Sequence, residues 1–229
     1  MADYTTFTEV DPSSHITITS ATRIDYSGLS RSESAYVYLD KGAAFYAGDF
    51  TFDVDVVCTS DTGGAGQVAF GYPWGVCNSV ENAKAVITNL GQLLTVELQS
   101  STVPVLVVAE YYNGTRYATA ITAALSYATT YYLRIRRDEA VGTYGTLYLD
   151  LYSDAARTSL TETKSVTLHA LVDFRYLYAS NTYNDGAAWA QTGYSQNLTQ
   201  YYAYSGSGGA IAGGSADYTR IALHIATGG

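Results

Sequence analysis

The strongest constraint on this chain is a pair of segments, 130–137 and 145–152, in which apolar and polar side chains alternate. Alternation with a period of two places each set on its own face of a β-strand. A short polar turn joins the segments, so they predict a β-hairpin with one face in a core and the other in water. The residues expected on the outer face are Tyr132, Arg134, Arg136, Tyr148, Asp150 and Tyr152.

Further segments repeat this pattern and predict an antiparallel β-sandwich. The segment 50–58 is the clearest single strand, and 218–226 is expected to form a C-terminal strand. Asn113-Gly114 is a strong two-residue hairpin signal and places Tyr112 opposite Thr115. The only stretch with helical character is 79–90. Many short strands with at most one or two short helices are typical of a sandwich or jelly roll.

The 229 residues are expected to form one domain, because all-β sandwiches of this size are common. A loop rich in Gly, Ala and Ser at about 200–216 precedes the expected C-terminal strand. In the hairpin formed by 130–137 and 145–152, we expect Ile135 to lie opposite Leu147.

The two cysteines, Cys58 and Cys77, are expected to remain free and buried. The glycine-rich turn after the strand 50–58 does not bring their Cα atoms close enough for a disulfide.

Charge and the N-terminal sequence bear on partners and location. The net charge of −9 argues against nucleic acid, which needs a cationic surface, and against anionic membranes. The polar N-terminal sequence lacks the apolar region of a secretory signal, and no apolar run could span a bilayer. We therefore expect synthesis in a cytoplasm, followed by a location in a virion or on an extracellular surface.

The hairpin resembles that of concanavalin A-like, laminin-G-type jelly rolls, in which an aromatic and alternating aliphatic and basic residues precede an apolar-Tyr-apolar-Asp strand. Several further segments of the chain are similar in sequence to uncharacterised phage and environmental proteins. The resemblance covers most of residues 7–199. The resemblance implies a fold of two packed antiparallel sheets. Members of this family bind glycans or proteins, some of them with calcium, and some relatives hydrolyse polysaccharides. The segments that carry the phage resemblance are 7–12, 35–38, 137–139, 142–145 and 173–176.

Catalytic signals are weak in the sequence. Glycoside hydrolysis needs two carboxyl groups at a set separation, and the nearest strand pair is Asp53 with Asp55. Glu97 and Glu110 each stand alone on their strands. These carboxylates are interpreted as solvated strand residues. The histidines have no ligand-like or nucleophile-elbow spacing and are expected to be structural; they are His15, His169 and His224.

Binding signals are stronger, because a sugar site needs aromatic surfaces and planar polar groups. The outer face of the hairpin supplies both, and Trp74 and Trp189 are expected in loops where they could add stacking surface. The same ladder could instead stabilise a sheet or pack against a neighbouring subunit. No cofactor is expected, although calcium could bind oxygen ligands from one loop, namely Asn181, Asn184 and Asp185.

Three functions follow in order of preference. The first is a non-enzymatic structural or adhesive protein of a phage virion or surface appendage that forms a homo-oligomer. The second is a carbohydrate-binding module for surface glycans. The third is a polysaccharide hydrolase or lyase, which the missing paired-carboxylate motif disfavours.

Overall fold

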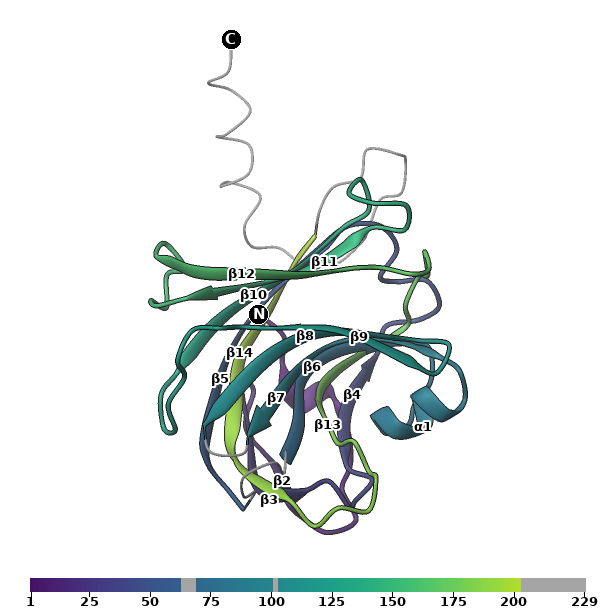
Figure 1. Cartoon of the computed structure of the whole chain (residues 1–229). Coiled ribbons are helices and arrows are strands. Elements are labelled where there is room, and N and C mark those ends of the chain that lie inside the picture. The colour runs from purple at the N-terminus through teal and green to yellow at the C-terminus, as the bar shows by residue number, and fades with distance from the viewer. Residues whose placement is uncertain (63–68, 101–102, 203–229) are drawn as a thin grey trace.

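A computed structural model describes residues 1–62, 69–100 and 103–202 (Figure 1). The expected strand at 218–226 and most of the loop at about 200–216 lie outside these residues, as does His224. The described strands form two antiparallel seven-stranded sheets. Sheet A has the order β1 (Thr8–Val10), β4 (Tyr36–Asp40), β13 (Tyr176–Asn181), β6 (Ala69–Cys77), β7 (Gln92–Ser100), β8 (Pro104–Tyr112) and β9 (Thr115–Ala120). Sheet B has the order β12 (Leu160–Thr167), β11 (Thr146–Tyr152), β10 (Tyr131–Asp138), β5 (Phe50–Asp61), β14 (Ala190–Tyr202), β3 (Arg23–Ser30) and β2 (Ile16–Ser20).

The two sheets pack face to face, which confirms the predicted β-sandwich. Alternate residues of β5 and β10 point into the space between the sheets, among them Phe52, Val54 and Ile135, all fully buried. Trp74 on β6 packs against Phe52, with ring centroids 5.4 Å apart. The apolar faces that alternation predicts therefore meet in one core, and the polar faces of the strands are left outside.

The hairpin of β10 and β11 forms, but its register differs from the prediction. Ile135 pairs with Leu149 instead of Leu147, and Arg137 takes the place opposite Leu147. The reason is that Asp138 pairs with Thr146 instead of Tyr144, so the connection between the paired residues is two residues longer than expected. The shift is two residues, so every side chain keeps its predicted face.

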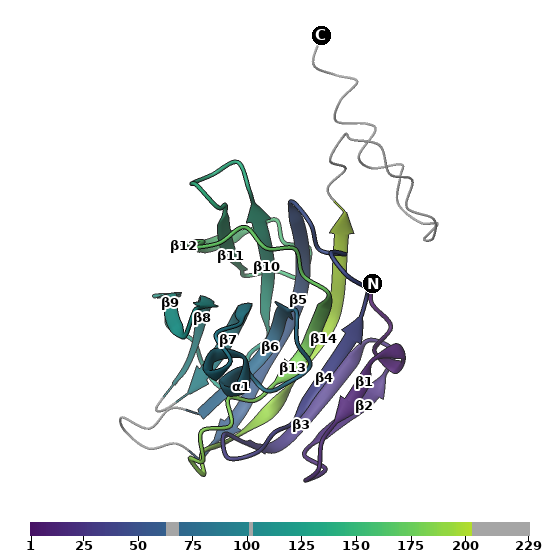
Figure 2. The same cartoon turned by 90° about the vertical axis from the view of Figure 1, so that its right-hand side faces the viewer.

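Two other local predictions can be compared with the structure. The Asn113-Gly114 turn joins β8 to β9 and pairs Tyr112 with Thr115, as predicted. The helical segment is shorter than 79–90: α1 spans Ala83–Thr88 and begins after Asn82, whose side-chain oxygen accepts a hydrogen bond from the Ala85 amide at 2.9 Å. Figure 2 shows α1 in front of the strands of sheet A, where it packs against β7.

Cys58 and Cys77 are both free and buried, as predicted. Burial raises the pKa of the Cys58 thiol to about 12, which keeps it protonated at neutral pH. Among the described residues, no helix is both long and apolar enough to cross a membrane.

Candidate functional site

The outer face of sheet B carries the largest group of predicted site residues. All six outward hairpin residues lie there, because β10 and β11 are neighbours in the sheet and share one register. We call this surface the tyrosine–arginine face; its residues are Tyr132, Arg134, Arg136, Tyr148, Asp150 and Tyr152. Of these six residues only Asp150 is buried, whereas the tyrosines and arginines are partly exposed.

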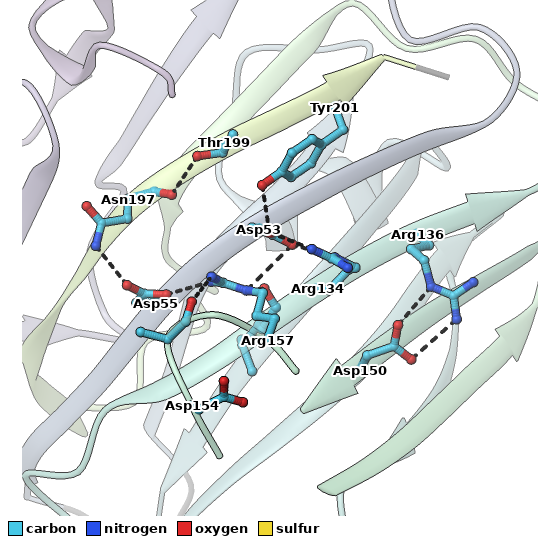
Figure 3. Close-up of polar contacts among 12 residues, drawn as sticks. Asp53, Asp55, Arg134, Arg136, Asp150, Asp154, Arg157, Asn197, Thr199 and Tyr201 are labelled. Carbon is cyan, nitrogen blue, oxygen red and sulfur yellow. Dashed lines mark hydrogen bonds and ion pairs between the residues drawn. The ribbon is translucent and has the colours of Figure 1, made fainter. Parts of the chain in front are cut away.

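Two arginines of β10 form bidentate pairs with aspartates of neighbouring strands (Figure 3). Arg134 donates from Nε and Nη2 to Asp53 on β5, at 2.8 and 2.9 Å. Arg136 donates from the same atoms to Asp150 on β11, at 2.8 and 3.3 Å. The hydrogen bonds to Asp53 and Asp150 raise the pKa of Arg134 and Arg136 above the ordinary arginine value. Both guanidinium groups are therefore charged and fixed in orientation.

A third arginine, which the sequence prediction missed, closes the network. Arg157 follows β11 in a turn and donates to Asp55 at 2.5 Å, while its Nε lies 3.6 Å from Asp53. From β14, the Tyr201 hydroxyl donates to Asp53 at 3.0 Å and the Asn197 amide to Asp55 at 2.8 Å. Arg157 stands in a turn outside any alternating pattern, so only the fold could place it here.

Asp53 and Asp55 are therefore not the solvated carboxylates that the sequence suggested. Their residues are only 3% and 4% exposed, because arginine, tyrosine and asparagine side chains cover them. Three aspartates face three arginines in the network, so its formal charge sums to zero. Each carboxylate accepts from at least one guanidinium and is covered by its partners, so none of the three offers the accessible carboxyl group that glycoside hydrolysis needs.

The tyrosines lie beside the arginines and complete the surface. The Arg136 guanidinium lies 4.6 Å from the Tyr148 ring centroid, and Arg134 lies 5.8 Å from that of Tyr152. Arg157 lies 6.0 Å from the Tyr132 ring. These cation–π contacts hold the rings in place. Nη1 of Arg134 and of Arg136 makes no hydrogen bond to another described residue, so both keep N–H donors for a ligand.

The other predicted contact residues lie elsewhere. Trp74 is on β6 instead of in a loop and is fully buried, because its ring fills the core between the sheets. Trp189 is partly buried just before β14, whose residue Gln191 pairs with Asp61 of β5. That position is six residues along β5 from the partner of Tyr132, or roughly 20 Å away. Trp189 therefore does not extend the tyrosine–arginine face.

The predicted calcium ligands do not form a set of free oxygens. The Asn181 side-chain oxygen accepts from the Thr182 amide at 2.8 Å, and its residue is buried. The Asp185 carboxylate is paired with Arg31. No described group of three or more His, Cys, Asp or Glu side chains could hold a metal ion. Calcium binding by these residues, with Asn184, stays a prediction.

On sheet A, the Glu97 carboxylate is buried and its hydrogen bonds are satisfied. It accepts from the Tyr111 hydroxyl at 2.7 Å and from Nε and Nη2 of Arg116 at 2.9 and 2.8 Å. Burial, followed by the nearby Glu97 charge, raises the pKa of Tyr111 above the ordinary tyrosine value. The interpretation of Glu97 as a solvated strand residue was wrong, since its side chain is 0% exposed.

Glu110 is also buried, and it orients a histidine at one end of the sandwich. His169 follows β12, and its Nδ1 lies 2.8 Å from Glu110 Oε2. The His169 backbone amide donates to the same oxygen at 3.0 Å, and Gln92 donates to Oε1 at 2.5 Å. The imidazole is 40% exposed and stacks on Tyr117, with ring centroids 3.5 Å apart. Sequence spacing could not join His169 to Glu110, because 59 residues separate them.

Comparison with known proteins identifies the fold. No protein-family model matches the chain, and no curated protein matches it. A legume lectin-like domain from Entamoeba histolytica has a TM-score of 0.55 at 12% identity and covers 87% of this chain and 91% of its own. Alginate lyase Aly36B has a TM-score of 0.51 at 13% identity, with 87% and 88% covered. The Bacillus licheniformis β-glucanase has a TM-score of 0.50 at 10% identity, with 85% and 91% covered.

These likenesses show that the chain has a concanavalin A-like jelly-roll fold, as the hairpin resemblance implied. They contradict the expectation of a non-enzymatic structural or adhesive phage protein, because structures with this fold include an alginate lyase and a β-glucanase. The resemblance to phage proteins rested on short strand segments. Unrelated β-sandwiches often have similar sequences in such segments, because their strands share the same alternation of apolar and polar residues.

Proposed function

We propose that this protein acts on polysaccharides and binds a neutral sugar chain across the tyrosine–arginine face. The observation that carries the proposal is the pairing of partly exposed tyrosine rings with arginines whose charge is balanced by buried aspartates. Aromatic rings pack against the C–H faces of sugar rings, while fixed N–H groups donate to sugar hydroxyls. The polysaccharide-processing enzymes and lectin-like domain that share the fold support this reading.

The charge balance selects the class of polysaccharide. A uronate chain carries a carboxylate on each sugar and binds well where cations lack partners. Here Arg134 and Arg136 already neutralise Asp53 and Asp150, so an added carboxylate meets no net positive charge. A neutral chain has no such requirement. Its binding should also depend little on salt, because screening acts on net charge.

The test is affinity electrophoresis and calorimetry with neutral glucan, mannan and xylan beside alginate. We expect binding to a neutral polymer, weakened about fivefold by Tyr148→Ala, which is roughly 1 kcal/mol of aromatic contact. Tyr144→Ala is the matched control, because Tyr144 is 43% exposed in the hairpin turn and not on this face. Binding of none of the neutral polymers, or equal loss in both variants, would contradict the proposal.

A second candidate function is polysaccharide cleavage by acid–base chemistry at His169, which stacks on Tyr117 of sheet A and is not part of the tyrosine–arginine face of sheet B. The specific observation is that the fully buried Glu110 carboxylate lies 2.8 Å from His169 Nδ1, which orients the imidazole and leaves Nε2 without a hydrogen bond to another described residue. The Tyr117 ring stacks on the imidazole and carries a hydroxyl, which can act as a hydrogen-bond donor. Such an oriented base and acid are what general acid–base catalysis requires.

Assays for new reducing ends and unsaturated products on the same polymers test this second function. We expect His169→Ala to lower the cleavage rate about 100-fold or more. His15→Ala is the control, because His15 is also paired with a carboxylate, that of Glu33 at 2.9 Å, and is similarly exposed. Unchanged cleavage by the His169 variant would exclude this residue as the base.

A further inference from the structure

A cavity of about 220 Å³ lies at the end of the β10–β11 hairpin. Its walls come from the segment between β9 and β10, from the end of β11 and from the start of β12. This volume is below the roughly 300–1,000 Å³ of pockets that hold drug-sized ligands, so it suits a single sugar residue or its substituent. The lining residues are Ala123, Ala124, Leu125, Thr129, Thr130, Tyr131, Leu151, Tyr152, Ser153 and Thr161.

Tyr152 belongs both to the lining of the cavity and to the tyrosine–arginine face. This residue lines the cavity and also pairs with Tyr132 across the hairpin. The Arg134 guanidinium lies 5.8 Å from the Tyr152 ring. A sugar chain on the face would therefore bring one residue, or a branch, to the mouth of the cavity.

The wall of the cavity is held in a defined position. Glu162 on β12 accepts from the backbone amides of Thr122 and Ala123, both at 2.9 Å. Leu125 is 5% exposed and packs in the core, and the Tyr131 hydroxyl accepts from the Ser126 amide at 2.5 Å. These contacts fix both ends of the segment that forms the wall, so the cavity is preformed.

The lining is neutral and mixes small apolar groups with hydroxyls. None of its side chains is charged, which disfavours a carboxylate, phosphate or amine in the cavity. Its alanines and leucines offer contact to a methyl group, and its threonine and serine hydroxyls can donate to a carbonyl oxygen. An acetyl group on a neutral sugar has both features in one substituent, and the cavity is large enough to admit it together with part of the sugar ring.

We infer that this cavity binds the acetyl group of an acetylated neutral sugar and so selects acetylated polysaccharide over the unsubstituted chain. The inference rests on the proposed function, since it adds a specificity pocket to the tyrosine–arginine face. Ala124 lies exposed at the cavity, so a phenylalanine there fills the space without disturbing the core.

The test measures binding of partially acetylated and fully deacetylated oligosaccharides of glucan, mannan and xylan by calorimetry. We expect the wild type to prefer an acetylated form about tenfold, the scale set by small apolar groups in a fitted pocket. Ala124→Phe should abolish that preference and leave binding of the deacetylated form unchanged. Ala156→Phe is the matched control, because Ala156 is exposed in the nearby turn and does not line the cavity.

The outcomes separate the inference from the proposed function. Two results would contradict acetyl binding in the cavity: equal binding of both forms by the wild type, or a preference that Ala124→Phe retains. Neither result would contradict sugar binding at the tyrosine–arginine face. Failure of the wild type to bind any of these oligosaccharides would overturn the proposed function itself. Thr161→Val gives a second probe, since it removes a lining hydroxyl with little change in volume and should weaken only the acetylated form.

Discussion

The aspartates of sheet B show how single residues decide the character of a surface. Asp53, Asp55 and Asp150 point outward on their strands, yet each is less than 5% exposed. A buried carboxylate without a partner is costly, so each depends on its arginine. The same arginines need the aspartates, because otherwise the face would carry three adjacent positive charges. The pairs therefore hold the tyrosines in place and keep the surface neutral.

At this scale, Asp150→Asn should lower the free energy of unfolding by about 1–2 kcal/mol. The variant loses a charge-assisted pair with Arg136 and weakens the hydrogen bond from Thr163, at 2.8 Å. Urea unfolding of the single variants and of a double variant with Arg136→Met measures the coupling. Asp25→Asn is the control, because the Arg23–Asp25 pair is more exposed and should be worth about 0–1 kcal/mol. Equal losses in the two aspartate variants would contradict the argument.

At the scale of elements, alternation predicted the faces but not the lengths. The face of each hairpin residue follows from a period of two, and one buried face makes that choice firm. Where β10 ends depends on Gly142 and Gly145, whose positive φ angles of 87° and 92° let the chain reverse after Asp138. A sequence pattern does not show which glycine takes that conformation. The candidate site divides in the same way, since the strand residues were predictable and Arg157, Tyr201 and the His169–Glu110 pair were not.

The β8–β9 turn gives a prediction for an element that the sequence described well. Gly114 has a φ of 76°, and a Cβ there would meet Leu90 Cδ2 at 3.2 Å. Gly114→Ala should therefore lower the free energy of unfolding by about 1–2 kcal/mol from backbone strain, with an added cost from the contact. Gly186→Ala is the control, because its φ is 86° and no atom lies within 4 Å of the added Cβ. Urea unfolding should show the greater loss for the Gly114 variant, and the reverse order would contradict the structure.

At the scale of the whole molecule, one carboxylate links the two sheets. Glu162 lies on β12, the edge strand of sheet B, and binds Thr122 and Ala123, which follow the edge strand β9 of sheet A. Its Oε1 also accepts from the Thr122 hydroxyl at 2.5 Å and lies 2.8 Å from Lys164 Nζ. These contacts require an ionised carboxylate, so the connection between the sheets depends on pH.

The hydrogen bond from Lys164, followed by that from the Thr122 hydroxyl, lowers the pKa of Glu162 from 4.5 to about 2. A carboxyl whose folded pKa is depressed contributes stability above its unfolded pKa and loses it as the pH falls toward the folded value. Glu162→Gln should therefore flatten the decline in unfolding free energy between about pH 4.5 and about pH 2. Glu9→Gln should have the opposite effect at higher pH, because burial raises the pKa of Glu9 above 4.5 and its contribution to stability grows as the pH falls through that raised value. Urea unfolding at a series of pH values tests this prediction. If the unfolding free energy changes with pH equally in wild type and Glu162→Gln, the Glu162 contact does not couple the sheets.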